Sequence, residues 1–191
     1  QEHEYPFLKR DYSINGKMKL FWEGQGLVLP QLLFYKNVFK RVRDFCELHI
    51  VTSETFPLYD PFYKVRTENF LKKFPIEAYY HKWNQKNNAA LFSKFDCGII
   101  PLDPRDKYKW HKPANKLIAF WFSGIPTLTS DTPAYREIGE KTTDDFLCKS
   151  EDEWVQKLES IYKMSADDRK HIAERNYAFV SKVFSNEEMD D

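Results

Sequence analysis

The sequence predicts an α/β domain in which a parallel sheet of about six strands is covered by helices on both faces. Strand-like and helix-like segments alternate from residue 17 to the end of the chain. The strand-like segments are apolar throughout, which is typical of parallel strands that are buried on both faces. The segments between them have apolar residues at helical spacing, as the crossover connections of such a sheet do. Together these observations indicate a doubly wound, Rossmann-like sheet.

Local signals place the individual elements. The expected strands cover residues 18–23, 47–52, 76–80, 97–102, 125–129 and 145–148. The expected helices cover residues 29–43, 68–74, 85–95, 113–122, about 151–164 and about 166–183. Pro30 suits the first turn of the helix over 29–43, and Gly124 stops the helix over 113–122. Ser150 and Ser165 precede acidic residues and are expected to cap the last two helices. The Pro-rich stretch 53–61 is expected to be irregular.

Composition limits the classes of function. The chain has 191 residues and a formal net charge of zero, so one large core is expected and a broadly basic surface for nucleic acid is not. We expect an irregular lead-in over residues 1–16 and one domain over 17–191. No segment has the pattern of a signal peptide or the length of a membrane span, which predicts a cytoplasmic protein. The chain starts at Gln1 instead of Met, which indicates that a preceding part is missing.

Metal binding is not expected. The three cysteines, Cys46, Cys97 and Cys148, lie far apart and have no zinc-ligand spacing, so buried free thiols in a reducing compartment are predicted. Asp103 and Asp106 superficially resemble a metal-binding DxD motif, but their spacing is wrong and no second ligand cluster is visible.

The carboxyl ends of the strands are where a doubly wound sheet binds its ligand, at the point where the strand order reverses. Five loops are therefore expected at this ligand-binding edge: residues 24–26, 52–54, 81–84, 103–116 and 131–137. The fourth of these runs directly into a predicted helix. The helix N-terminus offers free N–H groups and partial positive charge, which suit a diphosphate. Formal positive charge around it comes from Arg105, Lys107, Lys109, Lys112 and Lys116. The alternative is a solvated loop with ordinary surface lysines.

Residues 98–138 carry a family resemblance. Their pattern resembles a block of the form Pro-x-x-Lys-x-x-Glu-Tyr-x-x-x-Gly-x-Pro-Val, followed by a strand and Asp-x-Pro-x-x-Arg-Glu. That block occurs in the C-terminal, donor-binding domain of GT-B fold glycosyltransferases, especially bacterial ones that build surface polysaccharides. The residues in register are Asn115, Lys116, Leu117, Ile118, Ser123, Gly124, Pro126, Asp131, Pro133, Arg136, Glu137 and Ile138. The segments LFWEGQG, IEAYYHKWNQ and DCGIIPLDP resemble further parts of the same domain, so the resemblance covers residues 18–184.

The resemblance implies transfer of a sugar from a nucleotide-sugar to a polysaccharide or other glycan. It assigns donor binding to Gly24, Gln25, Gly26, Trp83, Asp103, Arg105, His111, Lys112, Asn115 and Lys116. No metal or other cofactor is implied. Catalytic residues and the acceptor site come largely from an N-terminal domain that this chain lacks, so no catalytic base is named and the fragment is expected to be inactive alone. Peripheral membrane association of the full-length protein stays open.

One departure from the family pattern bears on activity. The glutamate that binds the ribose hydroxyls is Ala119 here, and its acidic partner eight residues earlier is His111. Losing an acceptor for two hydroxyls costs a few kcal/mol unless it is replaced. Asp103 or Asp106 could replace it, or the donor could be of another kind. The remaining alternative is a degenerate domain that serves as a regulatory or interaction module.

Some smaller candidates keep two interpretations. Trp83 could stack on a nucleotide base or pack as a core or hinge residue, and Trp110 and His111 could bind a ligand or pack within their loop. His49 and His81 are isolated in the sequence and are expected to be structural or surface residues. A flavodoxin-like receiver or cofactor domain lacks the acidic cluster or glycine fingerprint that it needs.

Overall fold

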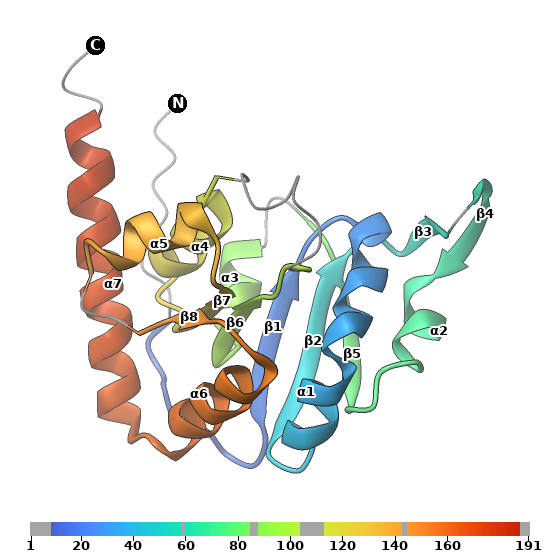
Figure 1. Ribbon diagram of the computed structural model, residues 1–191, viewed down its shortest axis with the longest axis horizontal. Helices are drawn as coiled ribbons and strands as arrows, with labels where there is room; N and C mark the ends of the chain where they lie inside the picture. Colours follow the sequence, from blue (N-terminus) through green and yellow to red (C-terminus); the bar gives the residue numbers. More distant parts are fainter. Residues whose placement is uncertain (1–8, 59, 85–87, 104–112, 143–144, 188–191) are drawn as a thin grey trace.

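A six-stranded, wholly parallel sheet forms the centre of the molecule (Figure 1). The computed structural model describes residues 9–58, 60–84, 88–103, 113–142 and 145–187. The strand order is β5-β2-β1-β6-β7-β8. The bounds are β1 Met18–Glu23, β2 Cys46–Thr52, β5 Ala78–Lys82, β6 Cys97–Ile100, β7 Thr127–Ser130 and β8 Leu147–Cys148. Every residue of β6 and β7 is buried, as the apolar runs predicted. The predicted fold class is confirmed.

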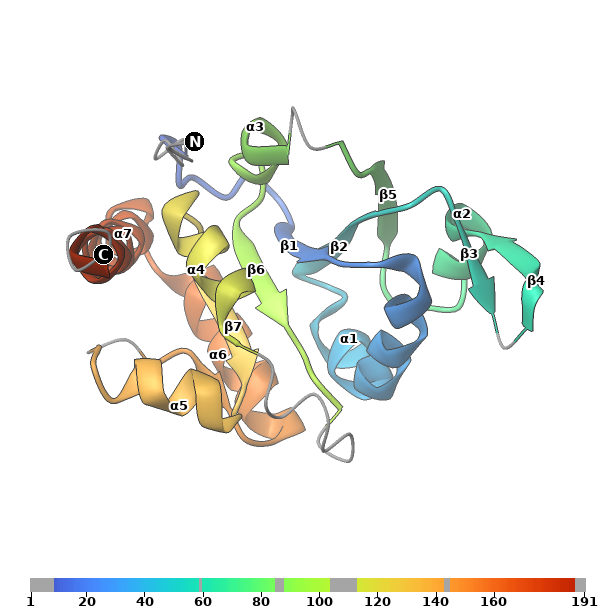
Figure 2. The same cartoon turned by 90° about the horizontal axis from the view of Figure 1, so that it is seen from above.

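Helices cover both faces of this sheet (Figures 1 and 2). The bounds are α1 Lys36–Val42, α2 Thr67–Leu71, α3 Asn88–Phe92, α4 Asn115–Phe122, α5 Pro133–Gly139, α6 Glu151–Lys163 and α7 Ala166–Glu187. Helices α1 and α6 pack side by side on one face, whereas α3 and α4 lie on the other and α4 packs against α7. The helices therefore change face between β1 and β6.

Three parts of the sequence-based assignment were wrong. Residues 131–137, expected to be a loop, contribute to helix α5. The helix expected over 29–43 is a 3-10 helix, η1 Gly26–Tyr35, followed by the short α1. Pro30 lies inside η1, where its ring and missing N–H disfavour a regular α-helix. The stretch 53–61, expected to be irregular, contributes to an antiparallel hairpin of β3 Thr55–Leu58 and β4 Asp60–Arg66. Its inner side buries Phe56 opposite Val65, while Phe62 is 94% exposed.

The last two helices begin at the predicted caps. The hydroxyl oxygen of Ser150 accepts from the Glu153 amide at 3.2 Å, and that of Ser165 accepts from the Asp168 amide at 3.1 Å. Each satisfies a backbone N–H that the first helical turn leaves without a partner. Gly124 ends α4 with φ of 71°, a conformation that favours glycine.

The three cysteines are buried free thiols, as predicted. Cys46 begins β2, Cys97 begins β6 and Cys148 ends β8, so they are spread across the sheet. Burial raises the pKa of all three thiols, that of Cys148 to about 12. They are therefore protonated and unreactive near neutral pH.

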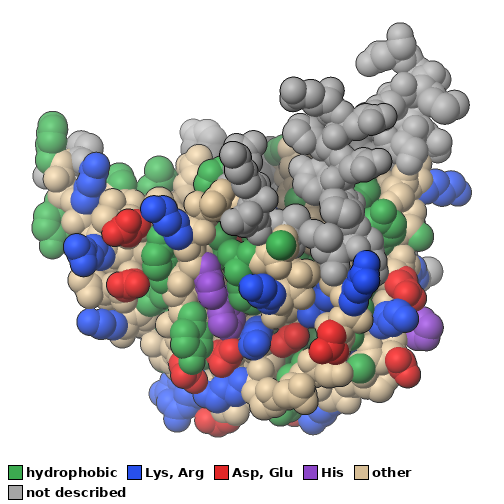
Figure 3. Space-filling model, turned by 180° about the vertical axis from the view of Figure 1, so that it is seen from behind, with side chains coloured by type: hydrophobic (Ala, Val, Ile, Leu, Met, Phe, Trp, Pro, Cys, Tyr) green, Lys and Arg blue, Asp and Glu red, His purple; other side chains and the backbone are tan. Residues whose placement is uncertain are grey.

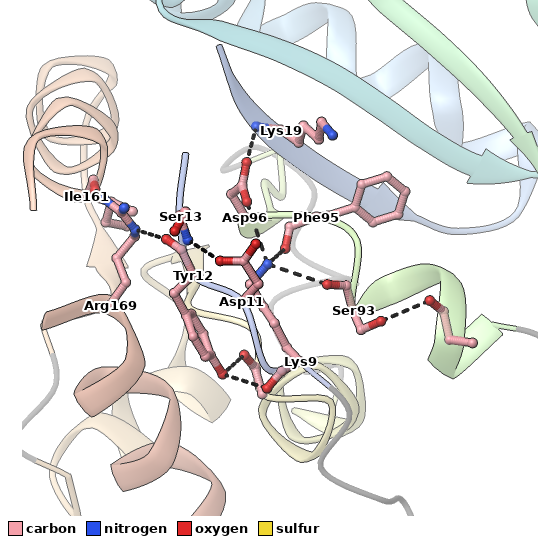
Figure 4. A network of polar contacts seen from close by, with 12 residues as sticks. Lys9, Asp11, Tyr12, Ser13, Lys19, Ser93, Phe95, Asp96, Ile161 and Arg169 are labelled. Carbon is pink, nitrogen blue, oxygen red and sulfur yellow. Dashed lines mark hydrogen bonds and ion pairs between the residues drawn. The ribbon is translucent and has the colours of Figure 1, made fainter. Parts of the chain in front are cut away.

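The described part of the lead-in, residues 9–16, has no helix or strand but is firmly held (Figure 4). The Lys9 ammonium is buried, donates to the Phe95 carbonyl at 2.7 Å and lies 3.5 Å from the Asp96 carboxylate. The buried Arg169 of α7 donates to the Tyr12 carbonyl at 2.9 Å and to the Ile161 carbonyl at 3.0 Å. These contacts fix the segment against β6 and the end of α6.

Candidate functional site

The candidate site lies at the carboxyl ends of β1 and β6. These strands are neighbours, yet the chain continues from β1 towards β2 and β5 and from β6 towards β7 and β8. The helices that follow the two strands consequently diverge to opposite faces. The strand ends at such a switch point form the usual ligand crevice of a doubly wound sheet.

A tight turn at Gly24 and Gly26 follows β1. The Gly24 amide donates to the Val51 carbonyl at 3.2 Å, and the Thr52 hydroxyl donates to the Gly24 carbonyl at 2.6 Å. A Cβ on Gly24 would stand 2.6 Å from the Trp22 ring, and one on Gly26 would stand 2.6 Å from the Phe56 Cβ. Close packing of the chain is therefore sufficient reason for both glycines.

Lys116 joins the start of α4 to the end of β1. Its ammonium donates to the Glu23 carbonyl, lies 3.7 Å from the Glu23 carboxylate and stands 5.4 Å from the centre of the Trp22 ring. The side chains of Lys116 and Glu23 are 31% and 25% exposed. A cation thus stands at the switch point, as the sequence predicted, but it is already engaged by a carboxylate that the prediction did not include.

Trp83 follows β5 at the same edge of the sheet. Its amide donates to the Thr52 carbonyl at 2.9 Å, and Thr52 in turn bonds to Gly24, so the ends of β5, β2 and β1 are connected. The Trp83 side chain is 46% exposed. Its ring is accessible to a ligand at the carboxyl edge and is not a core residue.

A cavity of about 500 Å³ opens further along this edge. The ends of β6, β7 and β8 and the starts of α5 and α6 form its walls, and Asp103 is the residue among the expected donor ligands that lines it. At its floor the Tyr35 hydroxyl lies 2.7 Å from the Leu102 carbonyl and 2.8 Å from the Ser130 hydroxyl. Burial raises the pKa of Tyr35, so its hydroxyl stays neutral.

The Asp-x-Pro-x-x-Arg pattern has a visible structural role. Both guanidinium nitrogens used by Arg136 donate to the Asp131 carboxylate, at 2.6 and 2.8 Å. Pro133 stands in the first turn of α5, between these two residues. The motif therefore ties the end of β7 to the helix that follows it.

The remaining expected ligands fall into two groups. Arg105, His111 and Lys112 lie outside the residues that the structure describes. Gln25 and Asn115 are exposed, in the turn after β1 and in the first turn of α4. Both positions lie at the carboxyl edge of the sheet, where the donor site is expected.

The two histidines that the sequence leaves isolated are partners in the structure. His49 on β2 lies 2.8 Å from His81 on β5, measured between Nδ1 and Nε2, and its Nε2 lies 3.0 Å from the Glu47 carboxylate. Burial lowers the pKa of both rings. Figure 3 shows histidine side chains near the middle of the face seen from behind. Adjacency on parallel strands 32 residues apart leaves no local signal in the sequence.

Among the described residues, no group of three or more His, Cys, Asp or Glu side chains could hold a metal ion. None of the described helices is long and apolar enough to cross a membrane.

The fold can now be compared with known proteins. No family model and no curated protein sequence matches the chain. Among solved structures, TarM matches with a TM-score of 0.60 and 8% identity over 91% of this chain and 34% of its own. WaaG, a glycosyltransferase involved in lipopolysaccharide biosynthesis, matches with a TM-score of 0.58 and 12% identity over 89% of this chain and 44% of its own. The catalytic domain of a cholesterol-α-glucosyltransferase from Helicobacter pylori matches with a TM-score of 0.58 and 10% identity over 87% of this chain and 98% of its own.

WaaG is named as a glycosyltransferase and the Helicobacter pylori enzyme as a glucosyltransferase, and the likeness of this chain to all three structures is one of fold. The molecule therefore has the Rossmann-like α/β fold that these structures share. It spans less than half the length of TarM and WaaG.

Proposed function

We propose that this chain is the C-terminal, donor-binding domain of a glycosyltransferase and binds a nucleotide-sugar in the crevice between β1 and β6. The observation that carries the proposal is the position of Lys116. A cation in the first turn of α4 stands at the switch point of a GT-B fold, where backbone N–H groups and positive charge converge. That arrangement suits the diphosphate of a nucleotide-sugar.

The chemistry assigned to this crevice is electrostatic. When a sugar leaves a nucleoside diphosphate, negative charge develops on the diphosphate oxygens. Lys116 and the α4 N-terminus would stabilise that charge without a metal ion. Trp83, whose ring is exposed at the end of β5, is positioned to stack on the base. The acceptor would be a glycan, as in bacterial polysaccharide synthesis in the cytoplasm, and catalytic groups would come from an N-terminal domain.

Lys116 must change partner for this to work. In the structure its ammonium is held by Glu23. A bound diphosphate offers more charge than one carboxylate, and a partly exposed ion pair contributes at most about 1 kcal/mol. Turning the ammonium from Glu23 to a phosphate is therefore energetically accessible.

Calorimetric titration with UDP, GDP and ADP, and with their sugars, tests the proposal on the whole chain. We expect one nucleoside diphosphate to bind with a Kd of about 1 mM or tighter, and its monophosphate to bind more weakly because it has fewer phosphate oxygens. A folded chain that binds none of these compounds would instead be a degenerate, non-catalytic module. Ala119, which stands within α4 in place of the expected glutamate, is the feature that favours this second function.

A further inference from the structure

The cavity at the ends of β6, β7 and β8 shares Asp103 with the expected donor site but extends away from Lys116. Its described lining includes neither Lys116 nor Trp83, and it reaches from η1 to the start of α6. Its volume of about 500 Å³ lies within the range of small-molecule sites in proteins. A ligand there would nevertheless stand at the same edge of the sheet as the donor crevice, because both features lie at strand carboxyl ends.

The floor of this cavity is rigid and uncharged. The Tyr35 hydroxyl is shared between the Leu102 carbonyl and the Ser130 hydroxyl, and the Ser130 hydroxyl also accepts from the Leu102 amide at 2.8 Å. These bonds join η1, β6 and β7 into one unit. The polar groups of the floor are thus held in place before any ligand arrives.

One wall offers hydrogen-bonding groups of both kinds. The Asp131 carboxylate and the Arg136 guanidinium stand side by side as a bidentate pair that supplies acceptors and donors together. Beside them lies Thr132, which is 2% exposed and whose hydroxyl has no hydrogen-bond partner among the described residues. A buried hydroxyl without a partner is costly, and a polar ligand atom at this wall would satisfy it.

Part of the lining is aromatic. Phe34, 48% exposed, and the buried Trp154 both line the cavity. The charges of the described lining nearly cancel, since three acidic side chains, Asp103, Asp131 and Glu151, accompany two basic ones, Arg136 and Lys149. The first turn of α6, which opens onto the cavity, is itself acidic. The described lining therefore has no excess of positive charge that would attract a phosphate-rich ligand.

We infer that this cavity binds a neutral sugar residue. The C–H face of a sugar ring packs on an aromatic ring, and its hydroxyls both donate and accept, as the Asp131–Arg136 pair and Thr132 require. The bound sugar belongs to the acceptor glycan, an assignment that rests on the proposed function. The acceptor then makes part of its contacts with this domain and not only with an N-terminal one.

Saturation-transfer NMR and calorimetry with defined sugars test this inference on the whole chain. The probes are the methyl glycosides of glucose, galactose, mannose and N-acetylglucosamine, together with maltose, cellobiose and lactose. We expect at least one of them to bind. Phe34→Ala should weaken that binding about tenfold by removing an aromatic ring from the lining. Leu27→Ala is the matched control, because Leu27 is 58% exposed on the same 3-10 helix and does not line the cavity.

A second variant separates binding from folding. Thr132→Val keeps the shape of the side chain, removes the hydroxyl and should leave thermal stability unchanged or raised while weakening sugar binding about threefold. The inference is overturned if no probe binds at tens of millimolar, or if Phe34→Ala and Leu27→Ala bind equally well. Lys116→Ala should leave sugar binding unchanged, so a failure of nucleotide binding and a failure of sugar binding are read separately.

Discussion

Replacing Lys116 by alanine is the most informative test of the donor crevice. A charge-assisted contact between its ammonium and a phosphate is worth about 1.5–3 kcal/mol, so nucleotide affinity should fall about ten- to a hundredfold. The structure adds a second effect. Glu23 loses its partner in this variant, and its carboxylate, 25% exposed, is then left close to the bound phosphates. Like-charge repulsion should place the loss towards the upper end of that range.

Glu23 gives this prediction an internal check. Glu23→Gln removes the competitor for the ammonium and should raise nucleotide affinity about threefold, because a partly exposed ion pair is worth at most about 1 kcal/mol. The double variant should bind better than Lys116→Ala alone. The three variants therefore form a double-mutant cycle with a coupling whose sign is stated in advance.

Calorimetry at low and high salt, with whichever nucleoside diphosphate binds the wild type, measures these effects. Lys163→Ala is the control, since Lys163 is 69% exposed on α6 and pairs with Glu159 on its own helix. The loss caused by Lys116→Ala should shrink as salt rises, because screening weakens the wild-type contact. Equal affinities for wild type and Lys116→Ala at low salt would refute the assignment of the phosphates to this crevice.

Three further predictions concern stability. Arg169→Ala should lower the free energy of unfolding, measured in urea, by about 3 kcal/mol, because it leaves buried carbonyls without donors. It should also speed amide exchange at residues 12–16. Amide exchange equal to that of the wild type would contradict this role of Arg169. Gly98→Ala should cost about 1–3 kcal/mol, since its Cβ would stand 2.6 Å from the Phe120 ring, and an unchanged melting temperature would show that α4 yields. Burial places the folded-state pKa of His49 below its unfolded value, so the free energy of unfolding of the wild type should fall as pH drops through about 6.5. His49→Gln should flatten this pH dependence in urea titrations. An unaltered pH dependence would exclude His49 as its source.

The sequence was sufficient for the sheet because the relevant signals are local. Apolar runs such as Cys97–Ile100 need both faces covered, and serine caps mark where helices begin. The β3–β4 hairpin was missed because its two prolines suggested irregular chain, whereas the pairing depends on burying Phe56 against Phe70 of α2. Tertiary packing of this kind overrides the local turn signal.

The candidate site was predictable only in outline. The rule for doubly wound sheets and the family resemblance indicated the carboxyl edge and Lys116, which does lie in the first turn of α4. The partner Glu23 lies 93 residues away in the sequence, and the Tyr35–Ser130 pair spans 95 residues. No spacing rule predicts which side chains meet over such separations, so the sequence indicated the cavity only through two segments singled out at the strand ends, residues 103–116 and 131–137.

The three buried cysteines can report on the local unfolding of the strands that carry them. Cys46, Cys97 and Cys148 lie on β2, β6 and β8, and an alkylating reagent reaches a protonated, enclosed thiol only when its strand opens. Mass-spectrometric labelling of the unmodified chain would therefore give an opening rate for one half of the sheet, its centre and its far edge in a single experiment. Ligand protection could be followed in the same way, strand by strand, without introducing a probe.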